Sequence, residues 1–294
     1  MFGAALGDIV GSEYEFMPIK SKDFVFLDNT MDYTDDTIMT VAVAEALLNS
    51  DIRDEETTKN NLVASMQKWG RRYPYPTGAY GSMFSSWLRS SSPKPYNSWG
   101  NGSAMRVSAS GWLYETIEET RKAARLSSVV THNHAEGVKG AEATASAVYL
   151  ARMGEEKESI KSYIEKEFGY DLSRPLDEIR ETYSFDGSCQ GTVPESIICF
   201  LEGKDTEDTI RNAISLGGDA DTMGAITGAI AGAYYHQMPY DLYEFAMSKL
   251  PDDIKGIIKL FDSVHARNVS YTWRNPNYDT EELIRKVKSG DIFI

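Results

Sequence analysis

Residues 221–235 read DTMGAITGAIAGAYY, with a glycine at every fourth position from 224 to 232. The beginning of the chain repeats this spacing, because Gly3, Gly7 and Gly11 lie about one helical turn apart. A glycine inside a helix costs about 1 kcal/mol relative to alanine, so two such rows need a compensating gain. We expect both segments to be helices that approach each other closely at the centre of the protein. Ordinary packing of small residues is the alternative for the glycines taken alone.

Helical periodicity dominates the rest of the chain. The pattern predicts helices over 36–49, 57–70, 117–130, 136–153, 157–168, 207–215, 241–249 and 280–288, besides residues 221–235 and a short helix near 82–89. Strand-like alternation is scarce, and it suggests only short extended pieces at Ile9, Val10, Val25, Phe26 and Leu27. We therefore predict an all-α fold, and we expect one domain over residues 1–294 because no linker divides the chain.

Composition narrows the classes of partner. The formal net charge of −14, from 44 acidic and 30 basic residues, weighs against a broad surface for nucleic acid or anionic lipid. Cys189 and Cys199 show neither metal-ligand spacing nor a disulfide framework, which favours a reducing compartment. The first residues make a poor signal peptide, and no apolar run reaches the length of a bilayer. We expect a soluble, cytoplasmic protein without a membrane partner, with a monomer as the favoured state.

Two acidic clusters stand directly before predicted helices. Residues 34–37 read Thr-Asp-Asp-Thr, and residues 219–222 read Asp-Ala-Asp-Thr. The helix macrodipole accounts for one carboxylate at a helix start, at about 0.3–1 kcal/mol, but not for two neighbouring aspartates beside hydroxyls. If the fold brings both clusters together, the carboxylates repel one another unless a cation lies between them. Mg²⁺ and Mn²⁺ prefer such hard oxygen ligands, so the clusters predict a metal site.

Two other enzyme classes use similar acidic strings. Phosphatases that form an aspartyl-phosphate carry Asp-x-Asp-x-Thr after a buried parallel strand, whereas residues 211–216 read here as a helix. Prenyl-diphosphate enzymes carry Asp-Asp-x-x-Asp in all-α folds, whereas Asp36 is followed by Thr37, Ile38 and Met39, so the third carboxylate is absent. We favour neither class.

Two segments rich in loop-forming residues could build a cleft. Residues 71–102 abound in Pro, Gly, Ser, Tyr and Trp, and read as long loops around the short helix near 82–89. Loops of this length in a compact domain are often functional, and these aromatic residues favour binding. Residues 170–195 form a second such region, which could wall the same cleft.

Five motifs follow one another in a fixed order. Residues 3–16 read GAALGDIVGSEYEF, 34–37 TDDT, 100–106 GNGSAMR, 131–132 TH and 217–222 GGDADT. With these motifs the chain resembles the ADP-ribosylglycohydrolase family. The resemblance implies a compact all-α orthogonal helix bundle with a central dinuclear metal site. It also implies hydrolysis of the α-glycosidic bond between ADP-ribose and an acceptor, either a protein side chain or a small molecule. A non-catalytic ADP-ribose-binding protein of the same fold is the alternative.

The resemblance implies two divalent cations, Mg²⁺ or Mn²⁺. The family motifs would place their ligands at Thr34, Asp35, Asp36, Asp219, Asp221 and Thr222. Glu15 would be the general base or would position the attacking water, and Asp35 and Asp36 would share in catalysis. Glu13, two residues away from Glu15, would face elsewhere.

The substrate contacts follow from the same resemblance. Backbone amides of the loop Gly78, Ala79, Tyr80, Gly81 and Ser82 would meet the diphosphate at a helix start. The ribose side of the cleft would be lined by Asn101, Gly102 and Ser103.

Three further residues keep two interpretations each. Trp99 would stack on adenine or pack in the core, and His132 would face the distal ribose or be a structural histidine, with His134 a weaker candidate. For Arg106 we favour a structural ion pair over a ligand contact. Some relatives that act on ADP-ribosyl-arginine carry an additional acidic residue in the loop that corresponds to residues 78–86. This loop has none here, so an arginine linkage is in doubt and the acceptor stays open.

Overall fold

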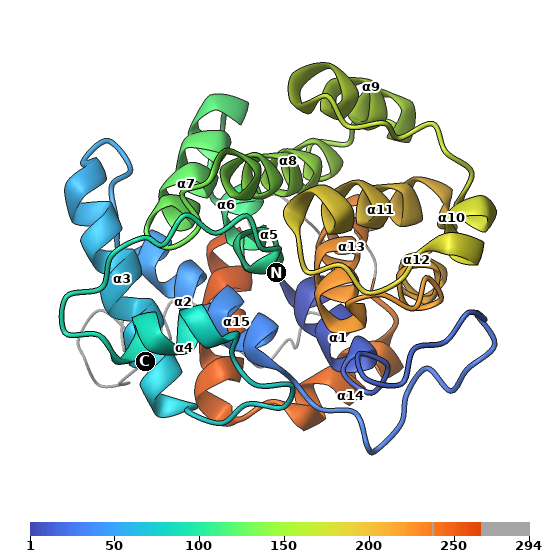
Figure 1. Cartoon of the computed structure of the whole chain (residues 1–294), viewed down its shortest axis with the longest axis horizontal. Helices are drawn as coiled ribbons and strands as arrows, with labels where there is room; N and C mark the ends of the chain where they lie inside the picture. The colour runs from blue at the N-terminus through green and yellow to red at the C-terminus, as the bar shows by residue number, and fades with distance from the viewer. Residues whose placement is uncertain (237, 266–294) are drawn as a thin grey trace.

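The computed structural model describes residues 1–236 and 238–265, and within them it consists of helices and loops without a β-strand (Figure 1). The helices are α1 (Phe2–Gly11), α2 (Asp35–Leu48), α3 (Glu55–Arg72), α4 (Ser82–Arg89), α5 (Gly102–Met105), α6 (Ser108–Leu113), α7 (Ile117–Val129), α8 (Ala135–Arg152), α9 (Lys157–Phe168), α10 (Leu176–Thr182), α11 (Cys189–Glu202), α12 (Thr206–Ile214), α13 (Ala220–Tyr234), α14 (Tyr240–Lys249) and α15 (Asp252–His265). The predicted all-α class is confirmed.

The strongly periodic segments are helices close to their predicted bounds. Helices α2, α3, α4, α7, α8, α9, α12, α13 and α14 correspond to the predicted ranges. The range 280–288 lies outside the described residues. The predicted extended pieces are wrong, because Ile9 and Val10 belong to α1, and residues 25–27 form no strand. Every residue of α1 is buried, so its packing outweighs the strand preference of two β-branched residues.

Helix α11 shows why sequence periodicity missed some elements. It begins at Cys189, inside a segment that we predicted as loop, and it contains Gly191 and Pro194. Proline removes one helical hydrogen bond and glycine lowers helix propensity, so both residues signal a loop locally. Most of α11 is nevertheless buried in the apolar core, and this packing sustains the helix.

Helices α1 and α13 lie against each other with their backbones in contact (Figure 1). A methyl group on Gly7 would lie 1.9 Å from the carbonyl oxygen of Gly224, and one on Gly11 would lie 2.3 Å from that of Ala220. No larger residue fits at these positions, so the predicted close approach is confirmed. Since later residues of α1 meet earlier residues of α13, the two helices are antiparallel. The end of α1 therefore lies beside the start of α13.

Most of the buried hydrophobic residues of the described chain form one cluster, to which α1, α2, α8, α11 and α13 all contribute. Among the described helices, none is both long and apolar enough to cross a membrane.

Candidate functional site

The two acidic clusters lie at neighbouring helix starts. Thr34 caps α2, because its hydroxyl oxygen accepts a hydrogen bond from the backbone N–H of Asp36 at 3.1 Å. Asp219 stands at the N-cap position of α13. The antiparallel contact of α1 with α13 carries the segment that follows α1 toward Asp221. Segments about 200 residues apart in the sequence thus lie side by side, which meets the condition under which the acidic clusters would repel each other.

Asp8 connects the start of α2 to α1, the helix that packs against α13 through its glycines. Its side chain is fully buried, and it accepts hydrogen bonds from the backbone N–H groups of Thr34 and Thr37, each at 3.0 Å. The hydroxyl groups of both threonines also donate to Asp8, that of Thr34 at 2.7 Å. We did not predict Asp8 as a site residue, although it stands in the first motif. Its carboxylate fixes the start of α2 relative to α1.

Glu15, Asp219 and Asp221 form the closest group of carboxylates. One oxygen from each lies within 4.8 Å of those of the other two. Oε2 of Glu15 and Oδ2 of Asp36 are buried and have no hydrogen-bond partner among the described residues. Buried carboxylate oxygens are normally paired, so these two atoms are suited to contact with a cation.

Burial and mutual repulsion disfavour the charged forms of these carboxyl groups. Burial, then the charge of Asp221, raises the pKa of Asp8 to about 7. Burial, followed by the charges of Asp221 and Asp8, raises the pKa of Glu15 to about 8. The pKa values of Asp35 and Asp36 are raised well above the ordinary range by burial and then by Asp221. A cation would relieve this repulsion.

The donor set fits a divalent cation such as Mg²⁺ or Mn²⁺, because it consists of carboxylate and hydroxyl oxygens. Thr34 donates its hydroxyl proton to Asp8 and accepts from Asp36, which leaves one lone pair of the hydroxyl oxygen for a further contact. Thr222 is also buried. Asp35 and Asp36 are not members of the closest carboxylate group, so the number of cations stays a prediction.

Asn101 supports the second acidic cluster directly. Its side-chain nitrogen donates to Oδ2 of Asp219 at 2.7 Å and to the hydroxyl oxygen of Thr192 at 3.2 Å. This hydrogen bond to Asp219 was not foreseen in the sequence, where Asn101 was expected to line the ribose side. Ser103 is fully buried and donates to the carbonyl oxygen of Gly137 at 2.7 Å, so its hydroxyl points into the protein.

The loop at residues 78–82 approaches the carboxylates at Gly78. Gly78 has a left-handed backbone with φ of +77°, and a methyl group on it would lie 2.9 Å from Oε2 of Glu15. Tyr80 is buried and donates its hydroxyl to the carbonyl oxygen of Tyr73 at 2.9 Å. Gly81 precedes α4 and provides no side-chain cap, so the first amides of α4 remain candidates for an anion. Ser82 lines a surface pocket of about 460 Å³ together with Lys94 and other residues.

Trp99 lies on a loop at the protein surface. Half of its surface is exposed, at 51%, so core packing is wrong as its explanation. Its ring meets that of His134 edge to face at 5.4 Å between centroids. The backbone N–H of Cys189 donates to the Trp99 carbonyl, and the N–H of Asn101 donates to the carbonyl of Gly187. The second loop-rich segment therefore pairs with the loop that carries Trp99.

His132 is buried behind this loop. Burial, then the nearby Arg106, lowers the pKa of its imidazole well below the usual value, so the ring is neutral. Its Nδ1 lies 2.8 Å from the hydroxyl of Thr131, and its Nε2 faces Gly100 and Gly102. His134 caps α8 instead, since its Nδ1 accepts from the N–H of Glu136 at 3.2 Å.

Arg106 is buried without the ion pair that we expected. Within the described residues, its guanidinium donates to the carbonyl of Ser127 at 3.0 Å and to the hydroxyl of Thr131 at 2.6 Å. It also lies over the ring of Phe84 at 5.7 Å. Its role is structural, through neutral oxygens and an aromatic face rather than a carboxylate.

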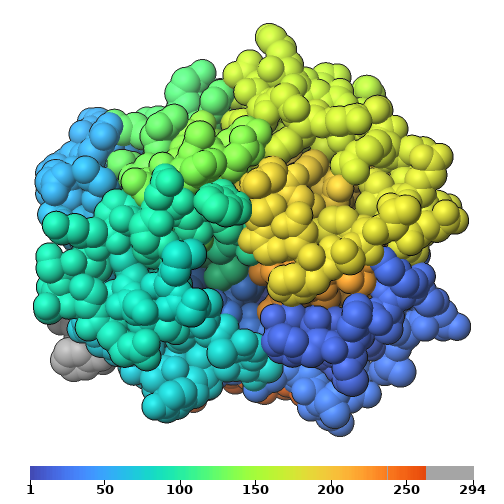
Figure 2. All heavy atoms as spheres, in the orientation of Figure 1, coloured from blue at the N-terminus to red at the C-terminus, as the bar shows by residue number. Residues whose placement is uncertain are grey.

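The surface is hollowed on one face of the molecule. Figure 2 shows the hollow near the centre of the view, where the blue, teal and yellow parts of the chain meet. These colours mark the N-terminal part of the chain, the loops around α4, and the beginning of α11.

Three comparisons with known proteins agree with one another. The family model for ADP-ribosylglycohydrolase matches residues 1–267. ADP-ribosylhydrolase ARH3 of Mus musculus is 29% identical, over 79% of this chain and 82% of its own, and the Homo sapiens protein is also 29% identical, over 79% and 83%. ADP-ribosylarginine hydrolase Tri1 of Pseudomonas putida is 24% identical, over 80% and 69%. A solved ADP-ribosylglycohydrolase-related protein complex superimposes with a TM-score of 0.61 at 25% identity, covering 90% of this chain and 92% of its own.

Proposed function

The chain belongs to the ADP-ribosylglycohydrolase family, and from that premise we propose that it hydrolyses the α-glycosidic bond between ADP-ribose and an acceptor, releasing ADP-ribose. The observation that carries the proposal is the meeting of Glu15, Asp219 and Asp221, whose oxygens lie within 4.8 Å of one another. These residues come from two motifs about 200 positions apart. Their convergence supports a reaction centre.

We propose that two divalent cations, Mg²⁺ or Mn²⁺, are held by Thr34, Asp35, Asp36, Asp219, Asp221 and Thr222. The bound cations would offset the clustered negative charge and orient the vicinal hydroxyls of the distal ribose. The unpaired Oδ2 of Asp36 and the raised pKa values of the carboxyl groups support this assignment. The hydrogen bond from Asn101 keeps Asp219 oriented toward the site.

Glu15 is the proposed general base. Its Oε2 is buried, is free of protein hydrogen bonds among the described residues, and faces the carboxylates under Gly78. It can therefore accept a proton from a water that attacks C1″ of the ribose, while the bond to the acceptor breaks. The lack of a side chain at Gly78 leaves space beside the Glu15 carboxylate, since even a methyl group at this position would contact that carboxylate.

The remaining substrate groups would lie on the surrounding loops. We propose that the first amides of α4, near Gly81 and Ser82, bind the diphosphate, since an uncapped helix start suits an anion even in an acidic protein. The exposed face of Trp99 would stack on the adenine ring. His132 is neutral and lies behind Gly102. It would hold the loop that carries Gly102 and would hydrogen bond toward the distal ribose.

The acceptor is proposed to be linked through something other than arginine. A guanidinium leaving group would need a carboxylate to bind it, and residues 78–86 contain none. The pocket beside this loop carries the cation of Lys94, and no carboxylate is among its lining residues. The name of the Pseudomonas putida relative points to arginine, so the arginine linkage belongs in the test.

The test is release of ADP-ribose from arginine-, serine-, O-acetyl- and nucleobase-linked substrates, with Mg²⁺, with Mn²⁺ and with a chelator. We expect release from one of the other linkages, loss of release with the chelator, and loss in Asp221→Asn. Release that the chelator and Asp221→Asn leave unchanged would contradict the metal site. Silence on every linkage, with ADP-ribose still bound in calorimetry, would favour a non-catalytic binding protein.

A further inference from the structure

Glu15 belongs to a long connection that holds no helix or strand. Residues 12–33 join α1 to the N-cap of α2, and Phe16 and Met17 on this connection are 71% and 61% exposed. Oε2 of Glu15 makes no hydrogen bond to the described residues. The position of its carboxylate is therefore set by the contacts of the connection and by the loop above it, rather than by a bond of its own.

Lys20 ties this connection to the turn that carries Asp219. Its ammonium group donates to the carbonyl oxygen of Leu216 at 2.6 Å and to that of Tyr183. Leu216 follows the end of α12, where carbonyl oxygens lack helical partners and the macrodipole favours a cation. Two residues separate Leu216 from Asp219. One side chain therefore joins the segment of Glu15 to the segment of its two partner carboxylates.

The backbone contacts at this turn leave little freedom. Gly217 has a left-handed φ of +62°, and a methyl group on it would lie 3.0 Å from the carbonyl oxygen of Ile19. A methyl group on Gly218 would lie 2.4 Å from the ring of Tyr183. The hydroxyl of Tyr183 donates to the carbonyl of Gly191 in α11 at 3.0 Å. The turn is thus packed between the connection on one side and Tyr183 on the other.

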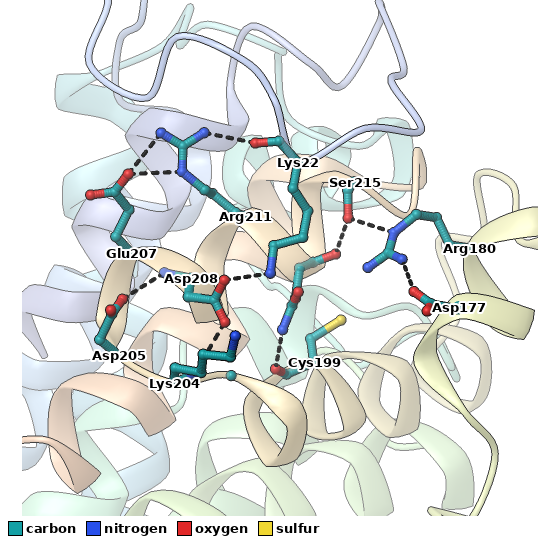
Figure 3. Close-up of polar contacts among 12 residues, drawn as sticks. Lys22, Asp177, Arg180, Cys199, Lys204, Asp205, Glu207, Asp208, Arg211 and Ser215 are labelled. Atoms are coloured by element: carbon teal, nitrogen blue, oxygen red, sulfur yellow. Dashed lines mark hydrogen bonds and ion pairs between the residues drawn. The ribbon is translucent and has the colours of Figure 1, made fainter.

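A second attachment holds the same connection farther along (Figure 3). Lys22 forms an ion pair with Asp208 of α12. Arg211 donates to the backbone carbonyls of Lys22 at 2.9 Å and of Phe24 at 2.8 Å, and it lies over the ring of Phe24 at 4.7 Å. Since the bonds of Arg211 go to the backbone, this attachment survives the loss of the Lys22 side chain.

We propose that Lys20 is a positioning residue, which holds the Glu15 carboxylate beside Asp219 and Asp221, where its negative charge strengthens cation binding without ligating a cation and where it acts in hydrolysis. This inference rests on the proposed function. Lys20 touches none of the three carboxylates in the described contacts, so it acts through the backbone that carries Glu15. The Lys22 side chain is not needed to position Glu15, because Arg211 holds the backbone carbonyls of Lys22 and Phe24 independently of it.

The test measures Mn²⁺ binding to the chelator-treated full chain by calorimetry, in the absence of substrate. We expect Lys20→Met to weaken the affinity about 10-fold, the lower end of the effect of losing a contact that orients a metal site, because Lys20 acts on the carboxylates only through the backbone. Lys20→Arg, which keeps donors toward both carbonyls, should restore it. Lys22→Met is the matched control, a lysine lost from the same connection, and should bind as the wild type does. If Lys20→Met fails to fold, Lys20→Gln, which keeps a donor nitrogen without the positive charge, replaces it.

A double-variant cycle separates positioning from general support of the fold. In the Glu15→Gln background, Lys20→Met should cause no further loss of Mn²⁺ affinity, because the group that it positions is already altered. A loss that is equal in both backgrounds would contradict the proposal, as would wild-type affinity in Lys20→Met. Failure of the wild type to bind Mn²⁺ would instead overturn the metal site itself, and the proposal with it.

Discussion

The side-chain nitrogen of Asn101 lies 2.7 Å from Oδ2 of Asp219, although the two residues are 118 positions apart. The loop that carries Trp99 and the start of α13 are therefore one unit. Because Asn101 also bonds to Thr192 of α11, its amide cannot turn away without breaking a second contact. Asp219 is held in orientation by a neutral donor, which leaves its negative charge available to a cation.

Replacing Asn101 should weaken this support. We predict that Asn101→Ala lowers Mn²⁺ affinity about 10-fold, because an outer-shell hydrogen bond orients the ligand. Calorimetry on the chelator-treated protein measures this. Asn61→Ala on the surface of α3, where Asn61 bonds to Asn49 and Ser50, is the matched control. Equal affinity of Asn101→Ala and Asn61→Ala would show that Asp219 needs no such support.

The contact of α1 with α13 should tolerate no side chain. A methyl group on Gly7 would overlap the Gly224 carbonyl, so we predict that Gly7→Ala lowers the free energy of unfolding by about 3 kcal/mol, the upper end of the usual cost of overpacking. Urea denaturation measures the loss. Gly256→Ala in α15 is the control, since nothing lies within 4 Å of its added methyl group, and it should gain up to about 1 kcal/mol. Similar stability of both variants would mean that the helices are not in backbone contact.

The glycine rows and the acidic clusters could be recognised in the sequence because each is a pattern of residues that lie close together along the chain. Four-residue spacing marks a helix face, and carboxylates before an apolar period mark a helix start, so α13 and its acidic N-terminus could be predicted. Asp8 was not predicted as a site residue, because the residues near it in the sequence do not indicate its hydrogen-bond partners, Thr34 and Thr37.

The contacts that orient the site were not predictable for the same reason. The bond of Lys20 to Leu216 spans 196 residues and leaves no periodic trace. Helix α11 was missed because Gly191 and Pro194 signal a loop locally, whereas its stability comes from packing on other helices. The pattern of neighbouring residues thus predicted the acidic residues of the site, whereas the hydrogen bonds that orient these residues are visible only in the folded structure.

The cation-free protein should lose stability as the pH rises. Folding raises the pKa of Glu15 from 4.5 to about 8 and that of Asp8 from 3.8 to about 7, so the folded state holds protons that the unfolded state releases. Stability is therefore greatest below about pH 4 as far as these groups contribute, and falls through pH 8. Melting temperatures in chelator between pH 5 and 8 measure the fall. Saturating Mg²⁺ should flatten it, whereas a rise in chelator would contradict the acidic cluster.

Trp99 should matter for ligand binding and not for stability. Because its ring is half exposed, Trp99→Ala should leave the melting temperature unchanged but raise the Kd for ADP-ribose about 10-fold, as loss of one base-stacking contact does. Calorimetry with ADP-ribose measures this. Tyr240→Ala, at an aromatic residue that is 64% exposed on α14, should change neither quantity. An unchanged Kd in Trp99→Ala would place the adenine elsewhere.

Turnover and ADP-ribose binding by Glu15→Gln test the central claim most directly. Glu13→Gln is the matched control, because Glu13 lies two residues away and accepts a hydrogen bond from Thr30 at 2.6 Å, outside the carboxylate group. We predict that Glu15→Gln still binds ADP-ribose but turns over the accepted substrate about 100-fold or more slowly, as loss of a general base does, while Glu13→Gln matches the wild type. Full turnover in Glu15→Gln would contradict the assignment of the base and of the site built around it.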